Sequence, residues 1–164
     1  MEARKNLEIL IGDDLFADPI VSRSLKRSIE PIKEILKHYK VGITYASTPK
    51  AMIQVVSAKS YDLIVTDLDY GTTGRVGTEG FEILDAINTM NPKPYILLCT
   101  SQDTHKEAIQ KCLASGKLNA VVGPGSFNKF SALKDHLIHY YSKTGAPAEG
   151  EKPLQAEGGR KNEK

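Results

Sequence analysis

Short apolar runs alternate five times with segments of helical periodicity, and this alternation constrains the fold more than any other feature of the chain. Repeated strand–helix units form a parallel sheet with right-handed crossovers and helices on both faces. We therefore predict an α/β fold, a flavodoxin-like (βα)5 three-layer sandwich, with a parallel five-stranded sheet of order 2-1-3-4-5. The apolar runs are residues 7–11, 41–45, 63–65, 95–99 and 120–122.

Carboxylates follow two of these runs at the points where they end. Leu63–Val65 is apolar throughout and contains the β-branched residues Ile64 and Val65, as expected of a central strand buried on both faces, and Asp67 and Asp69 come soon after it. The first run ends in Asp13 and Asp14. Ligands of open α/β sheets bind at the carboxyl ends of the strands, and the predicted switch point falls between strands one and three. Because adjacent strands lie roughly 4.8 Å apart, we expect these acidic ends to converge.

Converging carboxylates repel one another, and a hard divalent cation relieves that repulsion. Mg²⁺ takes oxygen ligands and is typically held by one or two carboxylates together with phosphate oxygens. An Asp beside such a cation can attack a phosphoryl group and form an aspartyl-phosphate. Thr100, in the pair Thr100-Ser101 after the fourth run, supplies a hydroxyl at the same edge. The pattern thus predicts phosphoryl chemistry with Mg²⁺.

Local signals predict where some helices begin and where the domain ends. Asp18-Pro19 is a helix cap followed by a proline at the first helical position, and Pro31 predicts a kink or two abutting helices in the segment that follows. We assign residues 1–142 to one globular domain. Residues 143–164 are rich in Gly, Glu, Lys, Ala and Pro and are predicted to be a disordered tail.

Composition limits the cellular compartments and the classes of binding partner that we expect for this chain. The formal net charge of +2, from 22 basic and 20 acidic residues, leaves little excess charge to neutralise phosphates, so direct nucleic-acid binding is not expected. Cys99 and Cys112 lack metal-ligand spacing and are predicted to be buried thiols in a reducing compartment. The chain shows neither a signal peptide nor a membrane span, and we expect a cytoplasmic protein.

These motifs, in this order, resemble the CheY-like receiver domain of two-component response regulators, from about Leu7 to Tyr141. The resemblance implies that Asp67 is phosphorylated in a phosphorelay. It implies that Asp14 contacts Mg²⁺ directly, Asp13 partly through water, and Asp69 through its backbone carbonyl. The implied partners are a sensor histidine kinase or a histidine phosphotransfer protein and a downstream protein target, and a homodimer is left open.

The chain departs from the family pattern at the predicted site. The family places a lysine before a proline after the last strand, where this chain has Gly123. The family also has an aromatic residue at the position that Ala120 occupies in this chain. Loss of such a fixed cation removes charge stabilisation worth on the order of 3 kcal/mol in comparable sites. Lys129, at the start of the last helix, and Arg75, in the long glycine-rich loop at 70–79, are candidate substitute cations.

Three functions are compatible with these residues. The first is a stand-alone receiver, a phosphoacceptor with autophosphorylation and autodephosphorylation rather than a conventional enzyme. The second is a pseudo-receiver that acts as a protein-interaction module without phosphorylation. The third is a phosphatase similar to haloacid dehalogenases. The segment Asp67-Leu68-Asp69 resembles the Asp-x-Asp motif of that family. That motif normally lies on the first strand, so this reading ranks last.

Overall fold

The computed structural model describes residues 3–71, 79–102, 104–126 and 128–144. The strands of the sheet are β1 (Lys5–Gly12), β2 (Tyr39–Ala46), β3 (Leu63–Thr66), β4 (Tyr95–Cys99) and β5 (Ala120–Val122). The helices are η1 (Asp14–Ala17), α1 (Pro19–Ile29), α2 (Ile32–Ile35), α3 (Pro49–Ala58), α4 (Glu79–Ile87), α5 (Lys106–Ala114) and α6 (Lys129–Thr144), of which η1 is a single 3₁₀ turn.

The strands form one sheet in the order β2-β1-β3-β4-β5, and every neighbouring pair is parallel. The predicted fold class and strand order are therefore confirmed. In the central pair, Gly12 at the end of β1 lies opposite Thr66 at the end of β3. This register decides the geometry of the site, because the residues that follow these two strands leave the sheet at the same level.

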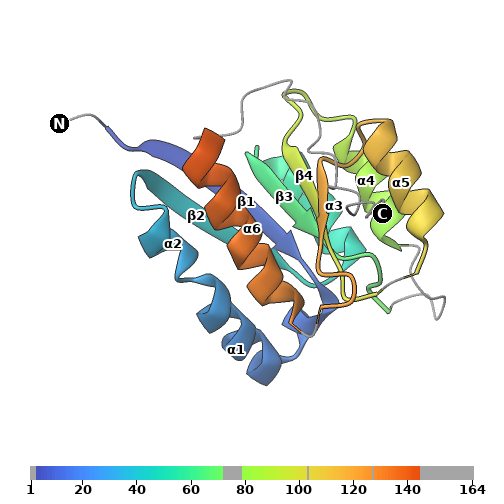
Figure 1. Cartoon of the computed structure of the whole chain (residues 1–164), viewed down its shortest axis with the longest axis horizontal. Helices are drawn as coiled ribbons and strands as arrows, with labels where there is room; N and C mark the ends of the chain where they lie inside the picture. The colour runs from blue at the N-terminus through green and yellow to red at the C-terminus, as the bar shows by residue number, and fades with distance from the viewer. Residues whose placement is uncertain (1–2, 72–78, 103, 127, 145–164) are drawn as a thin grey trace, which may run out of the picture.

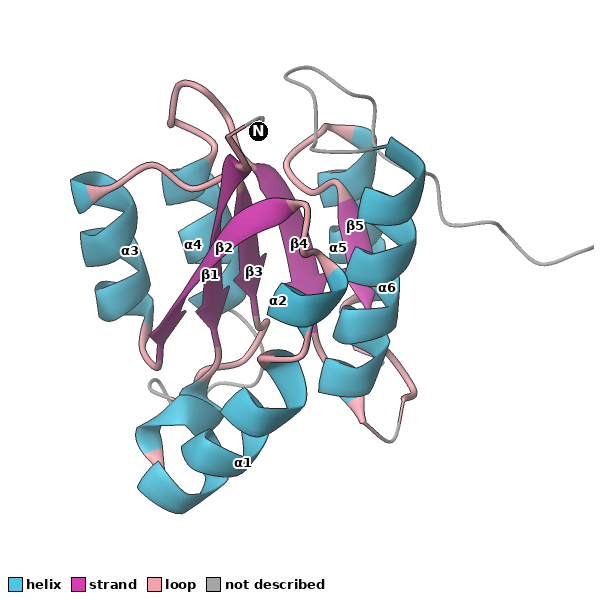
Figure 2. Ribbon diagram, turned by 90° about the vertical axis from the view of Figure 1, so that its left-hand side faces the viewer, coloured by secondary structure: helices cyan, strands magenta, loops and turns pink. Residues whose placement is uncertain are grey.

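Helices cover both faces of the sheet, which makes the three predicted layers. Figure 1 shows α6 lying across one face, with α1 and α2 beside it. In Figure 2, α3 and α4 stand on one side of the sheet and α2 and α6 on the other, while the strand arrows point toward the end where α1 lies. The acidic residues that follow β1 and β3 thus belong to the same end of the molecule as α1.

The two faces of the sheet carry separate apolar cores. On β1, Leu7, Ile9 and Ile11 pack toward the helices α1, α2 and α6, whereas Leu10 packs toward α3 and α4. The same alternation on β3 places Leu63 and Val65 on one face and Ile64 on the other, as period-two side chains require. All of these side chains are buried, so the central strands hold the site on a rigid base.

The helix signals of the sequence are confirmed in α1 and α2. The Asp18 carboxylate accepts hydrogen bonds from the amides of Ile20 and Val21 at 2.8 and 3.1 Å, with Pro19 at the first helical position. Near Pro31 the chain forms two abutting helices, since α1 ends at Ile29 and α2 begins at Ile32. A proline has no N–H to continue the hydrogen-bond ladder.

Two other sequence predictions need qualification. Cys99 and Cys112 are both free thiols, but only Cys99 is buried, because Cys112, a residue of α5, packs only partly against the core. Helix α6 continues to Thr144, into the stretch assigned to the tail, and residues 145–164 lie outside the described part of the chain.

Within the described ranges, no helix has the length and apolar character that crossing a membrane requires.

Candidate functional site

The carboxylates that follow β1 and β3 meet, as the sequence predicted. The Asp67 amide donates to the Gly12 carbonyl at 3.1 Å, which extends the β1–β3 ladder by one residue. Asp13, Asp14 and Asp67 each offer a carboxylate oxygen, and these oxygens lie within 4.8 Å of one another. Asp13 and Asp67 are only 1% and 6% exposed, and Asp14 is half-buried at the mouth of the cluster. The arrangement concentrates negative charge in a largely desolvated place.

Backbone amides hold two of the three carboxylates in position. The Leu68 amide donates to Asp67 Oδ1 at 2.7 Å, and the Leu15 amide donates to Asp13 Oδ1 at 3.0 Å. The second contact is the N-cap of the short helix η1, so the turn after β1 is itself organised by Asp13. Each of these two side chains therefore presents its Oδ2 atom to the interior of the cluster.

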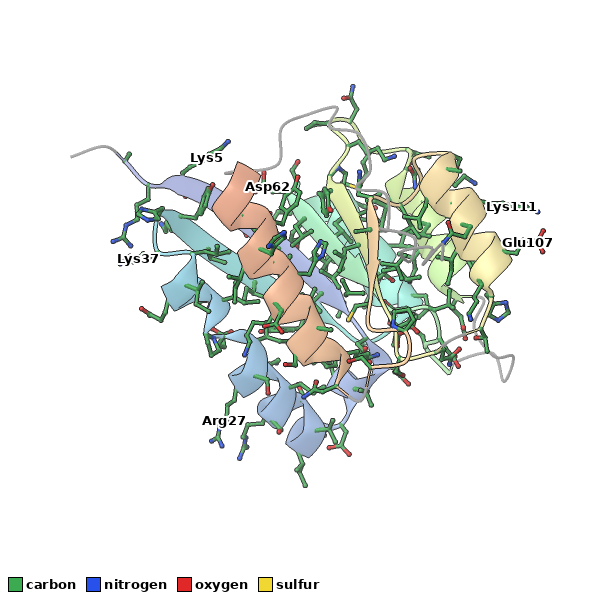
Figure 3. All side chains as sticks on the ribbon, in the orientation of Figure 1. Lys5, Arg27, Lys37, Asp62, Glu107 and Lys111 are labelled. Carbon is green, nitrogen blue, oxygen red and sulfur yellow. The ribbon has the colours of Figure 1, made fainter. Side chains whose placement is uncertain are left out.

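Lys129 brings a positive charge into the cluster. Its Nζ atom lies 2.5 Å from Asp13 Oδ2 and 3.0 Å from Asp67 Oδ2, and its side chain is only 10% exposed. The charged side chains labelled at the periphery in Figure 3 behave differently: the Glu107–Lys111 pair on α5 is 88% and 76% exposed. Because Lys129 is buried between two carboxylates, it compensates their negative charge where solvent cannot. This placement is what the prediction of Lys129 as a substitute cation requires.

Burial and mutual repulsion disturb the acid–base equilibria of the cluster. Burial raises the pKa of Asp67 and of Asp13 above the usual aspartate range, although the attraction of Lys129 opposes the shift. Burial and the neighbouring Asp13 raise the pKa of Asp14. Burial alone would lower the pKa of Lys129, but attraction to Asp13 and Asp67 outweighs it, so the Lys129 pKa is raised. The fold thus holds carboxylates that a cation would stabilise.

The structure explains why a glycine stands where the family pattern has lysine. Gly123 has φ +94°, and a Cβ atom there would lie 2.5 Å from the Thr100 carbonyl oxygen and 2.9 Å from Lys129 Cβ. A side chain at position 123 is therefore incompatible with this backbone. The space beside position 123 is taken by the stem of Lys129, so the cation enters the site from α6 instead.

Of the predicted hydroxyl pair, only Thr100 is buried. Thr100 is 1% exposed, its amide donates to the Val122 carbonyl at 3.1 Å, and its Oγ1 accepts the Gln102 amide at 3.2 Å. Ser101 is exposed to solvent beside it. The two predicted residues thus have different environments, and Thr100 is the one held by the neighbouring strand end.

Asp69 lies near the cluster, but its side chain is held by neighbouring loops. The Gly71 amide donates to Asp69 Oδ1 at 2.8 Å, and the Gln102 side-chain amide donates to Oδ2 at 3.1 Å. The carboxylate of Asp69 therefore ties the loop after β3 to the loop after β4. The predicted metal contact through its backbone carbonyl stays a prediction, and Arg75, the other candidate cation, lies outside the described residues.

Sequence reasoning missed Gln102 and two further residues that shape the site. A Cβ atom at Gly80 would lie 2.7 Å from Leu68 Cα, so only glycine lets the start of α4 pack against the backbone that carries Asp67. The Tyr70 hydroxyl, buried at 2% residue exposure, lies 2.9 Å from Thr66 Oγ1 and anchors the beginning of the long loop. The available signal for Gly80 was a glycine in a helical pattern, where it is normally unfavourable.

The donor set fits a hard divalent cation such as Mg²⁺. The oxygens of Asp13, Asp14 and Asp67 are carboxylate oxygens, the ligand type that Mg²⁺ prefers, and their spacing allows them to share one ion with water completing its shell. Softer nitrogen or sulfur ligands do not belong to this group, which is the one candidate metal cluster within the described residues.

Replacing Asp14 with Asn is expected to stabilise the protein without metal and to weaken its response to Mg²⁺. Because the folded-state pKa of Asp14 is raised, its ionisation opposes folding at neutral pH, and the neutral amide removes that cost. Saturation at 100 times the dissociation constant would stabilise the wild-type chain by about 2.7 kcal/mol, and this gain should largely disappear in Asp14→Asn. Thermal unfolding in EDTA and in Mg²⁺ measures both effects.

The control for this experiment is Glu107→Gln, which removes a negative charge from the exposed face of α5. It should leave both unfolding midpoints close to wild type. An Asp14→Asn protein that gains as much from Mg²⁺ as the wild-type chain would show that Asp14 is not a ligand.

Comparison with known families identifies a match over about two thirds of the chain. The model of the response regulator receiver domain matches residues 25–132. This range contains Asp67, Thr100 and Lys129, and it begins after the acidic pair Asp13 and Asp14. A search of curated proteins found no match.

Solved receiver structures share the fold. A response regulator from Hahella chejuensis superimposes with a TM-score of 0.59 at 19% identity, covering 85% of this chain and 97% of the other. A signal receiver domain of an HD domain-containing protein from Pseudomonas fluorescens gives 0.57 at 18%, covering 87% and 93%. The response regulator TrrA from Thermotoga maritima, in complex with Mg²⁺ and BeF, gives 0.52 at 24%, covering 80% and 96%.

Proposed function

The chain belongs to the response regulator receiver domain family, and from that premise we propose that it accepts a phosphoryl group on Asp67 with Mg²⁺ bound at the acidic cluster. The phosphoryl donor is a phosphohistidine of a sensor histidine kinase or of a histidine phosphotransfer protein. The output is a change in contacts with a downstream protein, and the chain acts as a phosphoacceptor rather than as a conventional enzyme.

The observation that carries this proposal is the environment of the Asp67 carboxylate. One oxygen is fixed by the Leu68 amide, while the other faces Lys129 beside Asp13 and Asp14. A nucleophile that is oriented, largely desolvated and next to a fixed cation is suited to phosphoryl transfer, in which catalysis consists mainly of positioning and charge stabilisation.

In the proposed reaction an Asp67 carboxylate oxygen attacks the phosphorus atom and forms a new O–P bond. The bond between phosphorus and the donor nitrogen breaks, and the imidazole leaves with the electron pair and takes a proton from solvent. Mg²⁺, when bound, would supply positive charge that neutralises the phosphoryl oxygens. Lys129 would pair with one of these oxygens once Asp67 Oδ2 is esterified or displaced, and the buried Thr100 hydroxyl lies at the neighbouring strand end to receive another.

The test is intact-mass measurement after incubation with Mg²⁺ and phosphoramidate, a small phosphodonor with the same P–N bond. We expect a mass increase of one phosphoryl group in the wild-type chain and none in Asp67→Asn. The conservative Asp62→Asn variant serves as a control, because Asp62 precedes β3 and its carboxylate instead accepts the Glu8 amide at 2.8 Å.

Each other outcome of this experiment identifies a different function. A wild-type chain that gains no phosphate and binds Mg²⁺ weakly would act as a pseudo-receiver, a module for protein contacts. Steady release of phosphate from phosphate monoesters would indicate the phosphatase reading of Asp67 and Asp69. An adduct that survives in Asp67→Asn would place the modification elsewhere and overturn the proposal.

A further inference from the structure

We propose that the first turn of α6 is the part of the molecule that responds when a divalent cation occupies the acidic cluster, because Lys129 and the cation compete for Asp13. This inference concerns the regulation of the proposed Mg²⁺ site and rests on that proposal. It does not depend on phosphorylation of Asp67.

The competition follows from how the oxygens of Asp13 are used. Asp13 Oδ1 accepts the Leu15 amide at 3.0 Å, and Asp13 Oδ2 lies 2.5 Å from Lys129 Nζ. Both oxygens are therefore engaged without a cation. The Leu15 contact caps η1 and belongs to the turn that carries the acidic pair, so the contact that can be released with the least rearrangement is the one to Lys129. A positively charged amine beside a bound cation is also repelled by it.

Lys129 remains attracted to Asp67 when it leaves Asp13. Its Nζ already lies 3.0 Å from Asp67 Oδ2, the oxygen on which the proposed phosphoryl chemistry centres. The amine is thus expected to move from a position shared between two carboxylates to a position beside Asp67 alone. That displacement occurs in a side chain with little free space, since it is 10% exposed and its Nζ lies 5.3 Å from the Phe130 ring centroid.

The first turn of α6 is packed so that a shift of Lys129 reaches its neighbours. The Lys129 carbonyl is 3.6 Å from the Cys99 Sγ that donates to it, and the Phe130 ring lies 5.9 Å from the ring of Phe16. Phe16 belongs to η1, which directly follows the acidic pair, and Cys99 directly precedes Thr100. The same turn of helix therefore contacts η1, which follows β1, and the end of β4, which Thr100 follows.

A response through α6 is also consistent with the absence of the aromatic residue that the family pattern has after its phosphorylation site. Ala120 stands where the family pattern has an aromatic residue, so a rearrangement of that side chain is not available here. The cation that contacts Asp67 belongs to α6 rather than to the loop after β5. A change at the site is therefore expected to be transmitted through the start of α6. Helix α6 covers one face of the sheet beside α1 and α2, as Figure 1 shows.

The test is a Mg²⁺ titration of metal-free protein followed by amide chemical shifts in NMR. In the wild-type chain we expect the amides of Lys129–Leu133 to shift with the same dissociation constant as those of Asp13 and Asp14. Lys129→Met should bind Mg²⁺ at least about tenfold more tightly, because a repelling charge a few ångströms away is gone. Its Asp13 and Asp14 amides should still shift, while the α6 response is lost.

Two further variants make the result specific. Lys134→Met removes the same charge from the same helix, about one turn and a half further on, and should titrate like the wild-type chain. Lys129→Gln keeps a hydrogen-bond donor without the charge, and it provides a second measurement should Lys129→Met be unstable; it should also bind Mg²⁺ more tightly.

The inference is overturned if the Lys129 variants bind Mg²⁺ with wild-type affinity, if their α6 amides shift as in the wild-type chain, or if no variant binds Mg²⁺. Wild-type α6 amides that stay still while Asp13 and Asp14 shift would likewise overturn it, since Lys129 would then rotate without moving its helix. A phosphoryl adduct on Asp67 together with any of these results would leave the proposed function standing, whereas tighter Mg²⁺ binding without an adduct would support only the inference.

Discussion

Lys129→Met is expected to acquire phosphate from phosphoramidate on the order of 100-fold more slowly than the wild-type chain, because removal of a preorganised charge contact in a comparable site costs 10²–10³ in rate. The variant removes the amine that lies 3.0 Å from Asp67 Oδ2 and leaves the nucleophile and the other carboxylates in place. The measurement is the rate of mass gain at saturating Mg²⁺, determined separately for each variant so that altered metal affinity does not enter the comparison.

Lys134→Met is the matched control and should react at the wild-type rate, because Lys134 lies further along α6 and belongs to neither ion pair of Lys129. Lys129→Arg adds a second comparison: it keeps the charge but places a larger, planar group in a buried space, so partial activity is expected. Equal rates in Lys129→Met and the wild-type chain would show that another cation serves Asp67. Arg75, the second candidate from the sequence, would then be the next residue to replace.

Returning a lysine to position 123 is expected to damage the protein rather than to restore the family pattern. Gly123→Lys should lower the free energy of unfolding by roughly 2 to 4 kcal/mol, the combined cost of a positive φ and of a Cβ atom pressed against backbone. In the Lys129→Met background it should not recover the rate of phosphate uptake. Chemical denaturation measures the first effect and intact mass the second.

The control for this prediction is Gly116→Lys. Gly116 also has a positive φ, +77°, but a Cβ atom there meets nothing within 4 Å. Its cost should therefore be only that of the backbone conformation, about 1 to 2 kcal/mol. Equal losses at the two positions would contradict the steric explanation for Gly123, and recovered phosphate uptake in the double variant would show that the turn after β5 can rearrange to accept the family lysine.

The parts of the fold that the sequence predicted are those with local physical causes. Strands such as Leu63–Thr66 and Tyr95–Cys99 were visible as uninterrupted apolar runs, and the division of the helix at Pro31 follows from the chemistry of one residue. Element ends were less well predicted: β2 begins at Tyr39 and α6 ends at Thr144, each beyond the apolar pattern that revealed it. Hydrogen bonding continues past the last residue that needs to be buried.

The acidic cluster was also predictable, because parallel strands align their carboxyl ends and place Asp13 and Asp67 together whatever their side chains contact. The roles of Asp69 and Gln102 were not, since the contact between their side chains joins loops after different strands. Gly80 was missed for a related reason. It must be small because it packs against the backbone of Leu68, which is distant from it in the sequence.

By itself the sequence determined the α/β class, the strand order and the edge at which the aspartates gather, because apolar periodicity and the handedness of parallel crossovers leave few alternatives. Only the tertiary structure decided which cation faces Asp67. Lys129 and Asp67 are 62 positions apart, and a pattern cannot tell whether a lysine at a helix start points to solvent or into a cluster. That choice depends on the space beside Gly123, which exists only after β4, β5 and α6 have packed together.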